Sequence, residues 1–588
     1  MQKDAIIAQA KDYIAKEKDA GFRKEVEDLL AKEDWKELED RFYRDLEFGT
    51  GGLRGIIGGG YNRMNTLVVK SATQGLATYI KKTFPGKSLS AAIAFDNRHY
   101  SAQFAEAAAL IFAANDIKTY LFSSLRPTPE LSFAIRELGC DTGIVVTASH
   151  NPPQYNGYKA YWNDGSQVVP PHDTGIIDEV GAVTEIKEMD KNEALSKGLL
   201  KIIDKEVDEP YWAMVKSRLF RPQLIKEKAG DVTIVYTPLH GTGAMHVEKV
   251  LGDLGLKVIT VPEQREPNGD FPTVAFPNPE EAAALEMAVN LGKKEKADVV
   301  MATDPDADRL GIAVPDGSAG SGGFTLVTGN QLGVLLADYI FLSLKELGKM
   351  PQKPAMVNSV VTTGMQKRVA QSYGAECFEC LTGFKWIADV WRRSETDGKG
   401  YTVVFGTEES YGYLVEPEVR DKDGVSAAAM TAEMTLYWRS KGKSLLDRLD
   451  ELYVTNGYWQ ELGISKYFQG SEGPAIMKGI MDEYRRNPPK TLGGITVEKV
   501  RDILESVWKI PGDPAKQEPV DLPKSDVLQF FLADGTVVSA RPSGTEPKIK
   551  FYATCCGEAK AGNLQETKAE VARKLDAIKK DIRSVIGD

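Results

Sequence analysis

Cysteine is scarce in this sequence, and long apolar runs are missing. Five cysteines in 588 residues are too few for a disulfide framework, so we expect a reducing, cytoplasmic location. Cys377 and Cys380 form one CxxC pair, but zinc needs a second ligand pair at suitable spacing, which the adjacent Cys555 and Cys556 do not supply. No stretch approaches the ~18 apolar residues of a membrane span, and the charged N-terminal segment lacks the apolar core of a secretion signal. We therefore expect neither a zinc site nor a membrane association.

Positive charge is also in deficit. The chain has 73 Lys and Arg against 84 Asp and Glu, a net charge of -11, which repels nucleic acid and anionic membranes. Hydrophobic residues make up 42% and charged residues 27%, as in ordinary soluble globular proteins. A small-molecule partner is therefore favoured over nucleic acid, and an anionic substrate would need a local cluster of basic side chains.

Apolar strands and amphipathic helices alternate along most of the chain. Residues 1–45 are expected to form charged helices, and a Gly-rich loop follows from Phe48 to Asn65. Ser101 is the expected cap of the first helix of the alternating part. The strands and helices predicted for this first round cover residues 88–97, 101–115, 117–122, 127–138 and 142–149. Such an order is typical of a largely parallel sheet between helices.

The alternation restarts near residue 231 and again near Gly329. The last part differs, because residues 526–555 are expected to form strands joined by a turn at Asp534-Gly535, before a charged helix. We therefore predict three similar α/β domains with mixed, largely parallel sheets, and a C-terminal α+β domain. At ~150 residues per domain, the chain length agrees with four domains. Their expected limits are 1–210, 211–325, 326–455 and 456–588.

Ser149 stands in the first of four loops with chemically useful side chains. The loop TASHNPP (147–153) directly follows the apolar strand GIVV. Its two prolines prevent a continuing helix, and ligands bind at the carboxyl ends of parallel strands. Alone, however, the segment could equally be a polar turn between two elements.

Three aspartates alternate in the second loop, DPDADR (304–309), after the strand VVMAT. Asp304, Asp306 and Asp308 can converge on one hard cation, and oxygen-only ligation suits Mg²⁺. An EF-hand is excluded because Arg309 stands where that loop needs Gly, and Pro315 where it needs Glu. The alternative is a solvated acidic turn, although packed carboxylates repel one another without a cation.

The third and fourth loops suit a sugar and a phosphate. GTEESYGY (406–413) has paired acids, a hydroxyl and aromatic rings, whereas RPSGTEPK (541–548) has an Arg, two hydroxyls, glycine-permitted amides and a Lys. Alone, the former could be a helix N-terminus and the latter a simple hairpin turn.

Together and in this order, the four loops resemble those of the α-D-phosphohexomutase family of phosphoglucomutases and phosphomannomutases. The resemblance extends from about Phe48 to Tyr552. It implies three similar α/β domains and a fourth domain around a central cleft. It also implies an isomerase that moves a phosphoryl group between two hydroxyls of a phosphosugar. The long N-terminus and FGTGGLRG are similar to a larger subgroup that includes phosphopentomutases.

The resemblance assigns roles to individual residues. Ser149 matches the phosphorylated serine, whose phosphate oxygen would complete a Mg²⁺ site with the three aspartates. The other matched active-site residues are Arg54, His150, Lys159, Arg309 and Lys385, the last in TGFK. The matched substrate-binding residues are Glu408, Ser410, Arg541, Ser543, Gly544, Thr545 and Lys548. Either Lys159 or Lys385 would transfer the proton, with His150 and Arg54 aiding orientation.

The sugar loop departs from the family pattern, because Tyr411 looks inserted and Tyr413 stands where many members have His. TGFK and EES are closer to phosphoglucomutases. We therefore expect interconversion of α-D-glucose 1-phosphate and glucose 6-phosphate, with glucose 1,6-bisphosphate as intermediate and activator. Mannose and pentose phosphates remain alternative substrates. A Mg²⁺-dependent phosphatase and a non-catalytic sugar-phosphate sensor remain as other classes, and the sequence indicates no oligomeric state.

Overall fold

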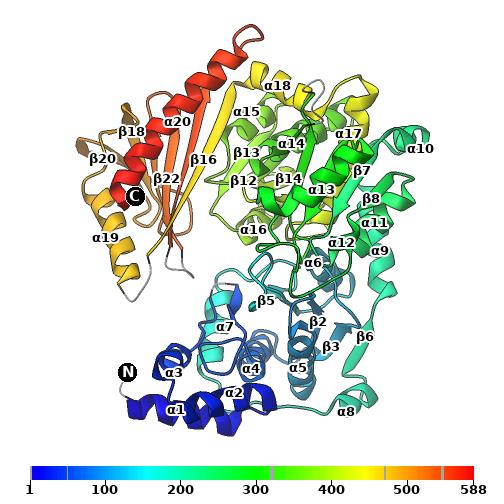
Figure 1. The fold of residues 1–588 in the computed structure, drawn as a ribbon, viewed down its shortest axis with the longest axis vertical. Helices are drawn as coiled ribbons and strands as arrows, with labels where there is room; N and C mark the ends of the chain where they lie inside the picture. Colours follow the sequence, from blue (N-terminus) through cyan, green and yellow to red (C-terminus); the bar gives the residue numbers. More distant parts are fainter. Residues whose placement is uncertain (1–2, 50, 318–322, 469–471, 544–547, 588) are drawn as a thin grey trace. The chain divides into compact units, whose positions relative to one another are not determined.

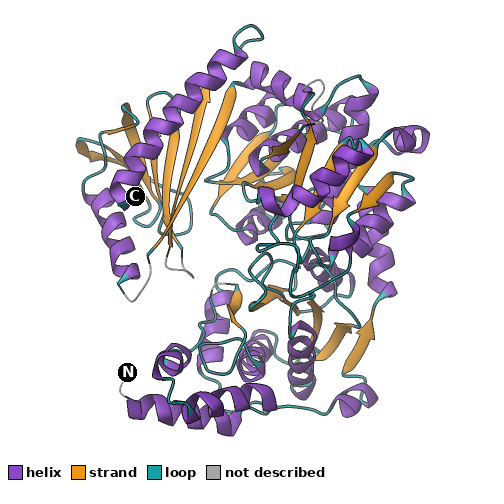
Figure 2. Cartoon of the chain, in the orientation of Figure 1, coloured by secondary structure: helices purple, strands orange, loops and turns teal. Residues whose placement is uncertain are grey.

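The computed structural model describes residues 3–49, 51–317, 323–468, 472–543 and 548–587, and Figures 1 and 2 show its helices and strands. The chain divides into two compact units. The first comprises Met1–Gly329 and Ser410–Lys441, and the second comprises Asn330–Glu409 and Gly442–Asp588. Within the described ranges, no helix combines the length and the hydropathy that a bilayer span requires.

The first unit begins with three short helices, as the sequence predicts. They are α1 (Lys3–Lys16), α2 (Ala20–Ala31) and α3 (Trp35–Phe42). Their apolar sides share a small core that includes Tyr13, Val26 and Phe42. The side chains of Asp19 and Asp34 accept backbone hydrogen bonds from the first turns of α2 and α3, which satisfies donors that a helix start leaves open.

A six-stranded mixed sheet follows, in the order β1-β5-β4-β2-β3-β6. Its strands are β1 (Gly52–Ile56), β2 (Ser90–Phe95), β3 (Lys118–Phe122), β4 (Thr142–Val146), β5 (Tyr155–Trp162) and β6 (Leu200–Ile203). The strands β4, β2, β3 and β6 run parallel, whereas β5 is antiparallel to both β4 and β1. The helices along residues 66–228 are α4 (Thr66–Thr83), α5 (Ser101–Ala114), α6 (Thr128–Glu137), α7 (His172–Gly181), α8 (Lys191–Ser196), α9 (Lys205–Ser217) and α10 (Pro222–Lys228).

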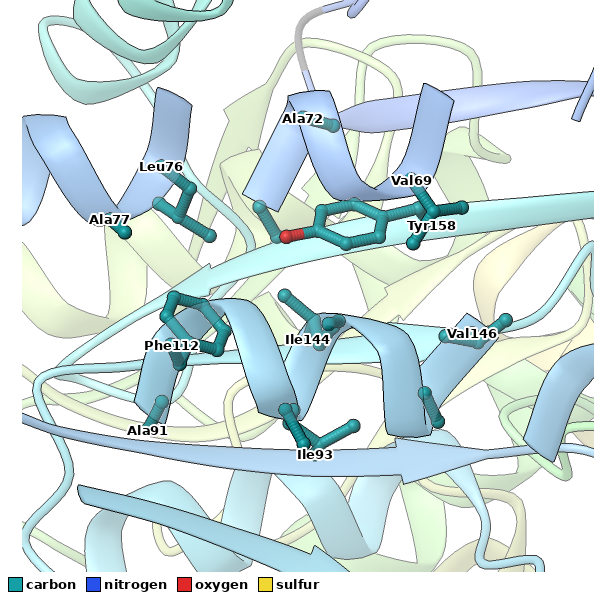
Figure 3. Close-up of a cluster of buried hydrophobic side chains, with 14 of the residues drawn as sticks. Val69, Ala72, Leu76, Ala77, Ala91, Ile93, Phe112, Ile144, Val146 and Tyr158 are labelled. Carbon is teal, nitrogen blue, oxygen red and sulfur yellow. The ribbon is translucent and has the colours of Figure 1, made fainter. Parts of the chain in front are cut away.

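The core of this sheet explains why its strands are apolar on both faces. Figure 3 shows Leu76 of α4 and Phe112 of α5 near Ile93 and Ile144 of the sheet. The helix α6 packs against β2 and β4, so both faces of these strands are buried, as expected for parallel strands between helices. Truncating a fully buried residue such as Ile93 to Ala would cost about 2–5 kcal/mol of stability.

Two local predictions were wrong. The Gly-rich segment was expected to be a loop, but Gly52–Ile56 forms the edge strand β1, paired with β5. Ser101 does not cap its helix: the N-cap is Tyr100, and the Ser101 hydroxyl donates to Asp96 Oδ1 at 2.7 Å. A buried carboxylate competes for this hydroxyl, which the sequence alone does not reveal.

The first unit also contains a five-stranded sheet in the order β11-β10-β9-β7-β8. Its strands are β7 (Thr233–Thr237), β8 (Lys257–Thr260), β9 (Val299–Thr303), β10 (Leu310–Pro315) and β11 (Phe324–Val327). The strands β9, β7 and β8 are parallel, and β10 is antiparallel to β9 and β11. The other elements of this part are α11 (Gly243–Asp253), α12 (Pro262–Arg265), α13 (Ala282–Glu295), β15 (Gly412–Leu414) and α17 (Gly424–Ser440).

The second unit combines a parallel sheet and an antiparallel sheet. The strands β12 (Pro354–Ser359), β13 (Glu376–Cys380) and β14 (Thr402–Glu408) run parallel in the order β13-β12-β14. The helices of this part are α14 (Gly329–Glu346), α15 (Gly364–Ser372), α16 (Phe384–Ser394) and α18 (Leu445–Asn456).

The C-terminal part of the second unit is α+β. Its antiparallel sheet has the order β16-β23-β22-β21-β18-β19-β20, with β17 paired to β18. The elements are β16 (Tyr458–Tyr467), α19 (Gly473–Arg486), β17 (Thr491–Leu492), β18 (Ile495–Asp502), β19 (Val507–Ile510), β20 (Asp513–Pro519), β21 (Leu528–Leu532), β22 (Val537–Pro542), β23 (Lys548–Gly557) and α20 (Leu564–Ile586). The predicted turn at Asp534-Gly535 joins β21 and β22, with Gly535 at a φ of 85° that favours glycine. The predicted fold class is confirmed.

Candidate active site

Ser149 lies beyond the carboxyl end of β4, as predicted. It is 3% exposed and has a φ of 51°, a left-handed conformation that costs a non-glycine residue about 1–3 kcal/mol. Its N–H donates to Thr147 Oγ1 at 2.8 Å. Its hydroxyl donates to Asp304 Oδ2 at 2.7 Å. The strained turn therefore directs the Ser149 hydroxyl, beyond the six-stranded sheet, toward the aspartate loop that follows β9 of the five-stranded sheet.

Asp304, Asp306 and Asp308 converge beyond the end of β9. One ligand oxygen from each lies within 4.8 Å of the others, and all three side chains are buried. Burial, reinforced by the charges of Asp308 and Asp306, raises the pKa of Asp304 well above its usual value. Among the described residues, Oδ1 of Asp306 and Oδ1 of Asp308 are buried without a hydrogen-bond partner. A small cluster of mutually repelling oxygens with open acceptor positions fits a hard cation such as Mg²⁺.

Two lysines partly compensate the aspartate charges. Lys159 Nζ lies 2.9 Å from Asp306 Oδ2 and 3.5 Å from Asp308 Oδ2. Lys422 Nζ lies 3.0 Å from the same Asp308 oxygen. Burial alone would lower the pKa of Lys159, but the charges of Asp306 and Asp308 outweigh it and raise that pKa. Lys159 is therefore an ammonium ion in this arrangement.

Arg309, His150 and Arg54 complete the polar surroundings of Ser149. The Arg309 N–H donates to Asp304 Oδ1 at 3.0 Å, and its guanidinium pairs with Glu280 at 2.6 Å. His150 Nδ1 lies 3.1 Å from Ser149 Oγ. Burial and the charges of Arg309 and Arg54 hold the pKa of His150 well below its usual value, so its ring is neutral. Arg54, exposed on β1, donates to Asn151 Oδ1 at 3.2 Å.

The second unit contains most of the residues predicted to bind substrate. Glu408 ends β14 and is 6% exposed, and the next residue, Glu409, accepts a hydrogen bond from Ser359 Oγ at 2.9 Å. The Arg541 side chain, in β22, interacts electrostatically with the side chain of Tyr552. Burial raises the pKa of Tyr552, and the charges of Glu409 and Glu408 add to this effect. The third and fourth loops therefore influence the same tyrosine.

The remaining predicted residues are placed as follows. Lys385 lies in the first turn of α16, 5.2 Å from the Trp386 ring centre. The Ser543 N–H donates to the Lys548 carbonyl at 2.8 Å, and Lys548 Nζ donates to Tyr467 Oη at 3.3 Å. Ser410 belongs to the first unit. Gly544 and Thr545 lie outside the described residues.

Tyr413, which stands where many family members have His, is a core residue of the first unit. It is completely buried, and its hydroxyl donates to the Gly329 carbonyl at 3.1 Å. Its departure from the family pattern therefore concerns packing at the start of α14.

Sequence reasoning missed three residues of this site. Thr128 Oγ1 donates to Asp306 Oδ2 at 2.9 Å, Lys422 pairs with Asp308, and Arg98 donates to carbonyls of the Ser149 loop. Thr128 and Arg98 follow predicted strands, where ligand-binding groups gather. Lys422 lies in RDKDG, directly before a long helix, and the sequence gives no signal of its burial.

Comparison with known proteins shows the family of the chain. Models of the phosphoglucomutase/phosphomannomutase α/β/α domains I, II and III match residues 45–187, 209–317 and 328–455, and the model of the C-terminal domain matches 488–571. Human phosphopentomutase is 35% identical over 94% of this chain and 92% of its own length. Phosphoribomutase of Saccharomyces cerevisiae is 35% identical over 94% and 93%. Phosphoglucomutase of Staphylococcus aureus is 34% identical over 98% of both chains.

Solved structures share the fold. Parafusin (phosphoglucomutase) from Paramecium covers 93% of this chain and 96% of its own at a TM-score of 0.68 and 18% identity. A phosphoglucomutase/phosphomannomutase family protein from Burkholderia thailandensis covers 91% and 96% at a TM-score of 0.63 and 18% identity. The chain belongs to the α-D-phosphohexomutase family. It is a phosphosugar mutase and hence an isomerase.

Proposed function

We propose that the chain interconverts α-D-glucose 1-phosphate and glucose 6-phosphate through a phosphoserine at Ser149 and glucose 1,6-bisphosphate. The observation that carries this proposal is the 2.7 Å hydrogen bond from Ser149 Oγ to the buried Asp304. A simple polar connection does not explain a strained, buried serine beside three carboxylates. A serine that carries a phosphoryl group beside a cation site does explain it.

The proposed chemistry has two balanced half-reactions. First, the bond between phosphorus and Ser149 Oγ breaks as a bond to the sugar hydroxyl oxygen forms. Oγ keeps the bonding electron pair, and the hydroxyl proton passes to a base. After the bisphosphate has turned round, Ser149 Oγ attacks the other phosphate and the bond between that phosphorus and the sugar oxygen breaks. The sugar oxygen keeps the bonding electron pair and takes a proton from the acid. No free phosphate is released, which distinguishes the mutase from a phosphatase.

Asp304, Asp306 and Asp308 are the proposed Mg²⁺ ligands, together with an oxygen of phosphorylated Ser149. When bound, the cation would neutralise charge that develops during phosphoryl transfer. The Arg309 N–H fixes one Asp304 oxygen, which keeps the other turned toward Ser149.

Lys159 is the proposed proton-transferring residue of the first unit. Its ammonium ion is held by Asp306 and Asp308, so it can stabilise phosphoryl oxygens and give a proton to a leaving oxygen. Because the Ser149 hydroxyl is directed at Asp304, the neutral His150 ring is placed to donate from Nδ1 to Oγ. Lys385 is the alternative acid or base.

We assign sugar binding to Glu408 and Ser410, and binding of the non-reacting phosphate to Arg541, Ser543 and Lys548, with Gly544 and Thr545 from the same loop. The Arg541 guanidinium suits bidentate recognition of a phosphate.

A pentose phosphate is the second candidate substrate. Relatives named phosphopentomutase and phosphoribomutase match this chain about as well as those named phosphoglucomutase, at 35% identity in each case. TGFK and the EES of the sugar loop support glucose, because these residues are the closest resemblance to phosphoglucomutases.

The test is a coupled assay with α-glucose 1-phosphate, Mg²⁺ and catalytic glucose 1,6-bisphosphate. Formation of glucose 6-phosphate is followed, with mannose 1-phosphate and ribose 1-phosphate run in parallel. Fast turnover of glucose 1-phosphate without free phosphate would support the proposal. Turnover of ribose 1-phosphate alone would replace glucose by a pentose, free phosphate would indicate a phosphatase, and binding without turnover would indicate a sensor.

A further inference from the structure

Asp96 and Arg98 lie just beyond β2, beside the Ser149 loop. The parallel neighbours β2 and β4 place Phe95 opposite Val146, so Asp96 and Thr147 are the first residues past the two strand ends. Asp96 is 2% exposed and Arg98 is 3% exposed. Buried charges cost several kcal/mol unless they are paired and hydrogen-bonded. What these two charges bind therefore indicates their function.

The Arg98 guanidinium binds main-chain carbonyls around the whole Ser149 loop. Nη1 donates to the Pro152 carbonyl at 2.9 Å and to the Tyr155 carbonyl at 3.1 Å. Nη2 donates to the Ser149 carbonyl at 2.5 Å and also to that of Asn151. A planar, permanently charged guanidinium can donate hydrogen bonds to several carbonyls in a fixed geometry. The loop is thus folded around one side chain.

Asp96 lies beside Arg98 and Thr147, on the N–H side of Ser149. Arg98 Nε lies 3.3 Å from Asp96 Oδ2, and the Arg98 N–H donates to Oδ1 at 2.9 Å. The Asp96 carboxylate also interacts with the Thr147 hydroxyl, whose oxygen accepts the Ser149 N–H at 2.8 Å. The ion pair therefore acts on the Ser149 carbonyl directly and on its N–H through Thr147.

We propose that Asp96 and Arg98 are positioning residues that hold Ser149 in its left-handed conformation, so that Oγ faces Asp304. This inference rests on the proposed function, in which Ser149 Oγ carries the phosphoryl group. A left-handed serine is strained, so its neighbours must fix it for the conformation to persist. The pair touches neither substrate nor the reacting atoms in this role. Its effect passes through the loop backbone.

The experiment follows phosphorylation of Ser149 and steady-state turnover in Arg98→Ala. Labelled glucose 1,6-bisphosphate is mixed with the dephosphorylated protein, and incorporation of label is timed. Displacement of a reacting group by ~1 Å costs roughly 100-fold in rate, so labelling and kcat should both fall by about that factor. KM for the monophosphate should change by less than about threefold, because substrate contacts remain. Added guanidinium ion should restore part of the lost rate by entering the vacated site.

Arg41→Ala is the matched control. Arg41 is also buried, and its donors bind Glu25, Glu37 and the Gly59 carbonyl, away from the Ser149 loop. The Arg41→Ala substitution should lower thermal stability, while the labelling rate and kcat stay within about twofold of the parent values. Arg98→Lys keeps the charge but loses the planar guanidinium. Its labelling rate should be lower than that of the parent, and added guanidinium ion should not change it.

Labelling at the parental rate in Arg98→Ala would overturn the inference. So would a slow rate that guanidinium does not raise and that comes with an equal loss of substrate affinity, since that pattern indicates general disorder. If Arg98→Ala does not fold, Arg98→Lys and Asp96→Asn decide the matter by the same labelling rates. Absence of label on the parent protein, or full turnover by Ser149→Ala, would instead overturn the proposed function.

Discussion

Ser149 Oγ lies 2.7 Å from Asp304 Oδ2, although 155 residues separate the two along the chain. Each residue follows the carboxyl end of a strand, Ser149 after β4 and Asp304 after β9. Two similar sheets thus contribute one polar side chain each from the loops that follow β4 and β9. The hydroxyl already points at the carboxylate that would face its phosphate, so little rearrangement would precede phosphoryl transfer.

Ser149→Ala should remove nearly all mutase turnover while folding survives. The substitution deletes only the hydroxyl that would carry the phosphoryl group, and Ala keeps the loop backbone. The measurements are the coupled assay and a thermal melt. Ser196→Ala, at the exposed end of α8, is the control and should change stability by no more than about 0.5 kcal/mol. Near-parental turnover in Ser149→Ala would contradict the assigned nucleophile.

Mg²⁺ should raise the melting temperature of the protein, because it binds the native aspartate cluster. Saturation at about 100 times the dissociation constant would add about 2.7 kcal/mol to the free energy of unfolding. Asp304→Asn should lose this increase yet melt no lower than the metal-free parent, because burial already disfavours the charged form of Asp304. Asp270→Asn, exposed on the surface, should keep the full response. An unchanged Mg²⁺ response in Asp304→Asn would mean that the cation binds elsewhere.

The two candidate lysines should differ in their kinetic effects. Lys159→Met removes an ammonium ion that pairs with Asp306 and Asp308, so kcat should fall by about 10²–10⁴-fold, as on loss of a general acid or base. Lys385→Met should act mainly on KM. Steady-state kinetics of both variants across pH make the comparison. A large fall in kcat confined to Lys385→Met would reverse the assignment.

Arg541→Ala should mainly raise the KM for the sugar monophosphate. Loss of charge-assisted hydrogen bonds to a phosphate costs about 1.5–3 kcal/mol, which corresponds to roughly 10- to 150-fold in KM. Arg573→Ala, on the exposed side of α20, is the matched control and should leave KM unchanged. If Arg541→Ala altered only the melting temperature, the loop would be a simple hairpin connection.

Glu130 should make the protein less stable as pH rises from about 4.5 to 7. Burial raises its pKa to about 7, so the unfolded chain releases this proton at lower pH than the folded chain, and the stability contribution falls across that window. The difference amounts to at most about 3 kcal/mol. Glu130→Gln keeps the shape without the charge, so its stability relative to the parent should increase between pH 5 and 7.5.

Denaturant titrations of the parent and of Glu130→Gln at several pH values measure how the difference in their free energies of unfolding varies with pH. His246 faces Glu130, with Nε2 3.1 Å from Oε2, and Trp212 Nε1 donates to His246 Nδ1 at 2.8 Å. An indole N–H can only donate, so the neutral ring carries its hydrogen on Nε2, toward Glu130. A stability difference that does not vary with pH would contradict the shifted pKa.

The elements that the sequence predicted well are those with strong local signals. The apolar runs of β2, β4 and β9 and the periodic helices between them appear close to their expected limits. By contrast, β1 and β5 contain glycines and polar residues, and they become strands because they pair with each other and with β4. Pairing partners far along the chain are not visible in a local pattern.

The same distinction applies to the site. Ser149 and the aspartates could be found because each follows an apolar strand in an unusual polar loop. Arg98 and Lys422 could not, because a single charged residue usually indicates a solvated surface. Only the fold shows that Arg98 is enclosed by carbonyls and that Lys422 neutralises Asp308.

The division of the first unit between two stretches of chain affects how the protein is made. Residues 410–441, which include Lys422 and α17, belong to that unit, although the intervening segment belongs to the other. Ribosomes add about 5–20 residues per second. Lys422 is therefore synthesised on the order of ten seconds after the aspartate loop. During that interval the nascent unit has an incompletely compensated acidic cluster and an uncovered surface where α17 will pack. Synthesis, rather than the chemistry of the finished site, therefore sets the earliest time at which this mutase can work.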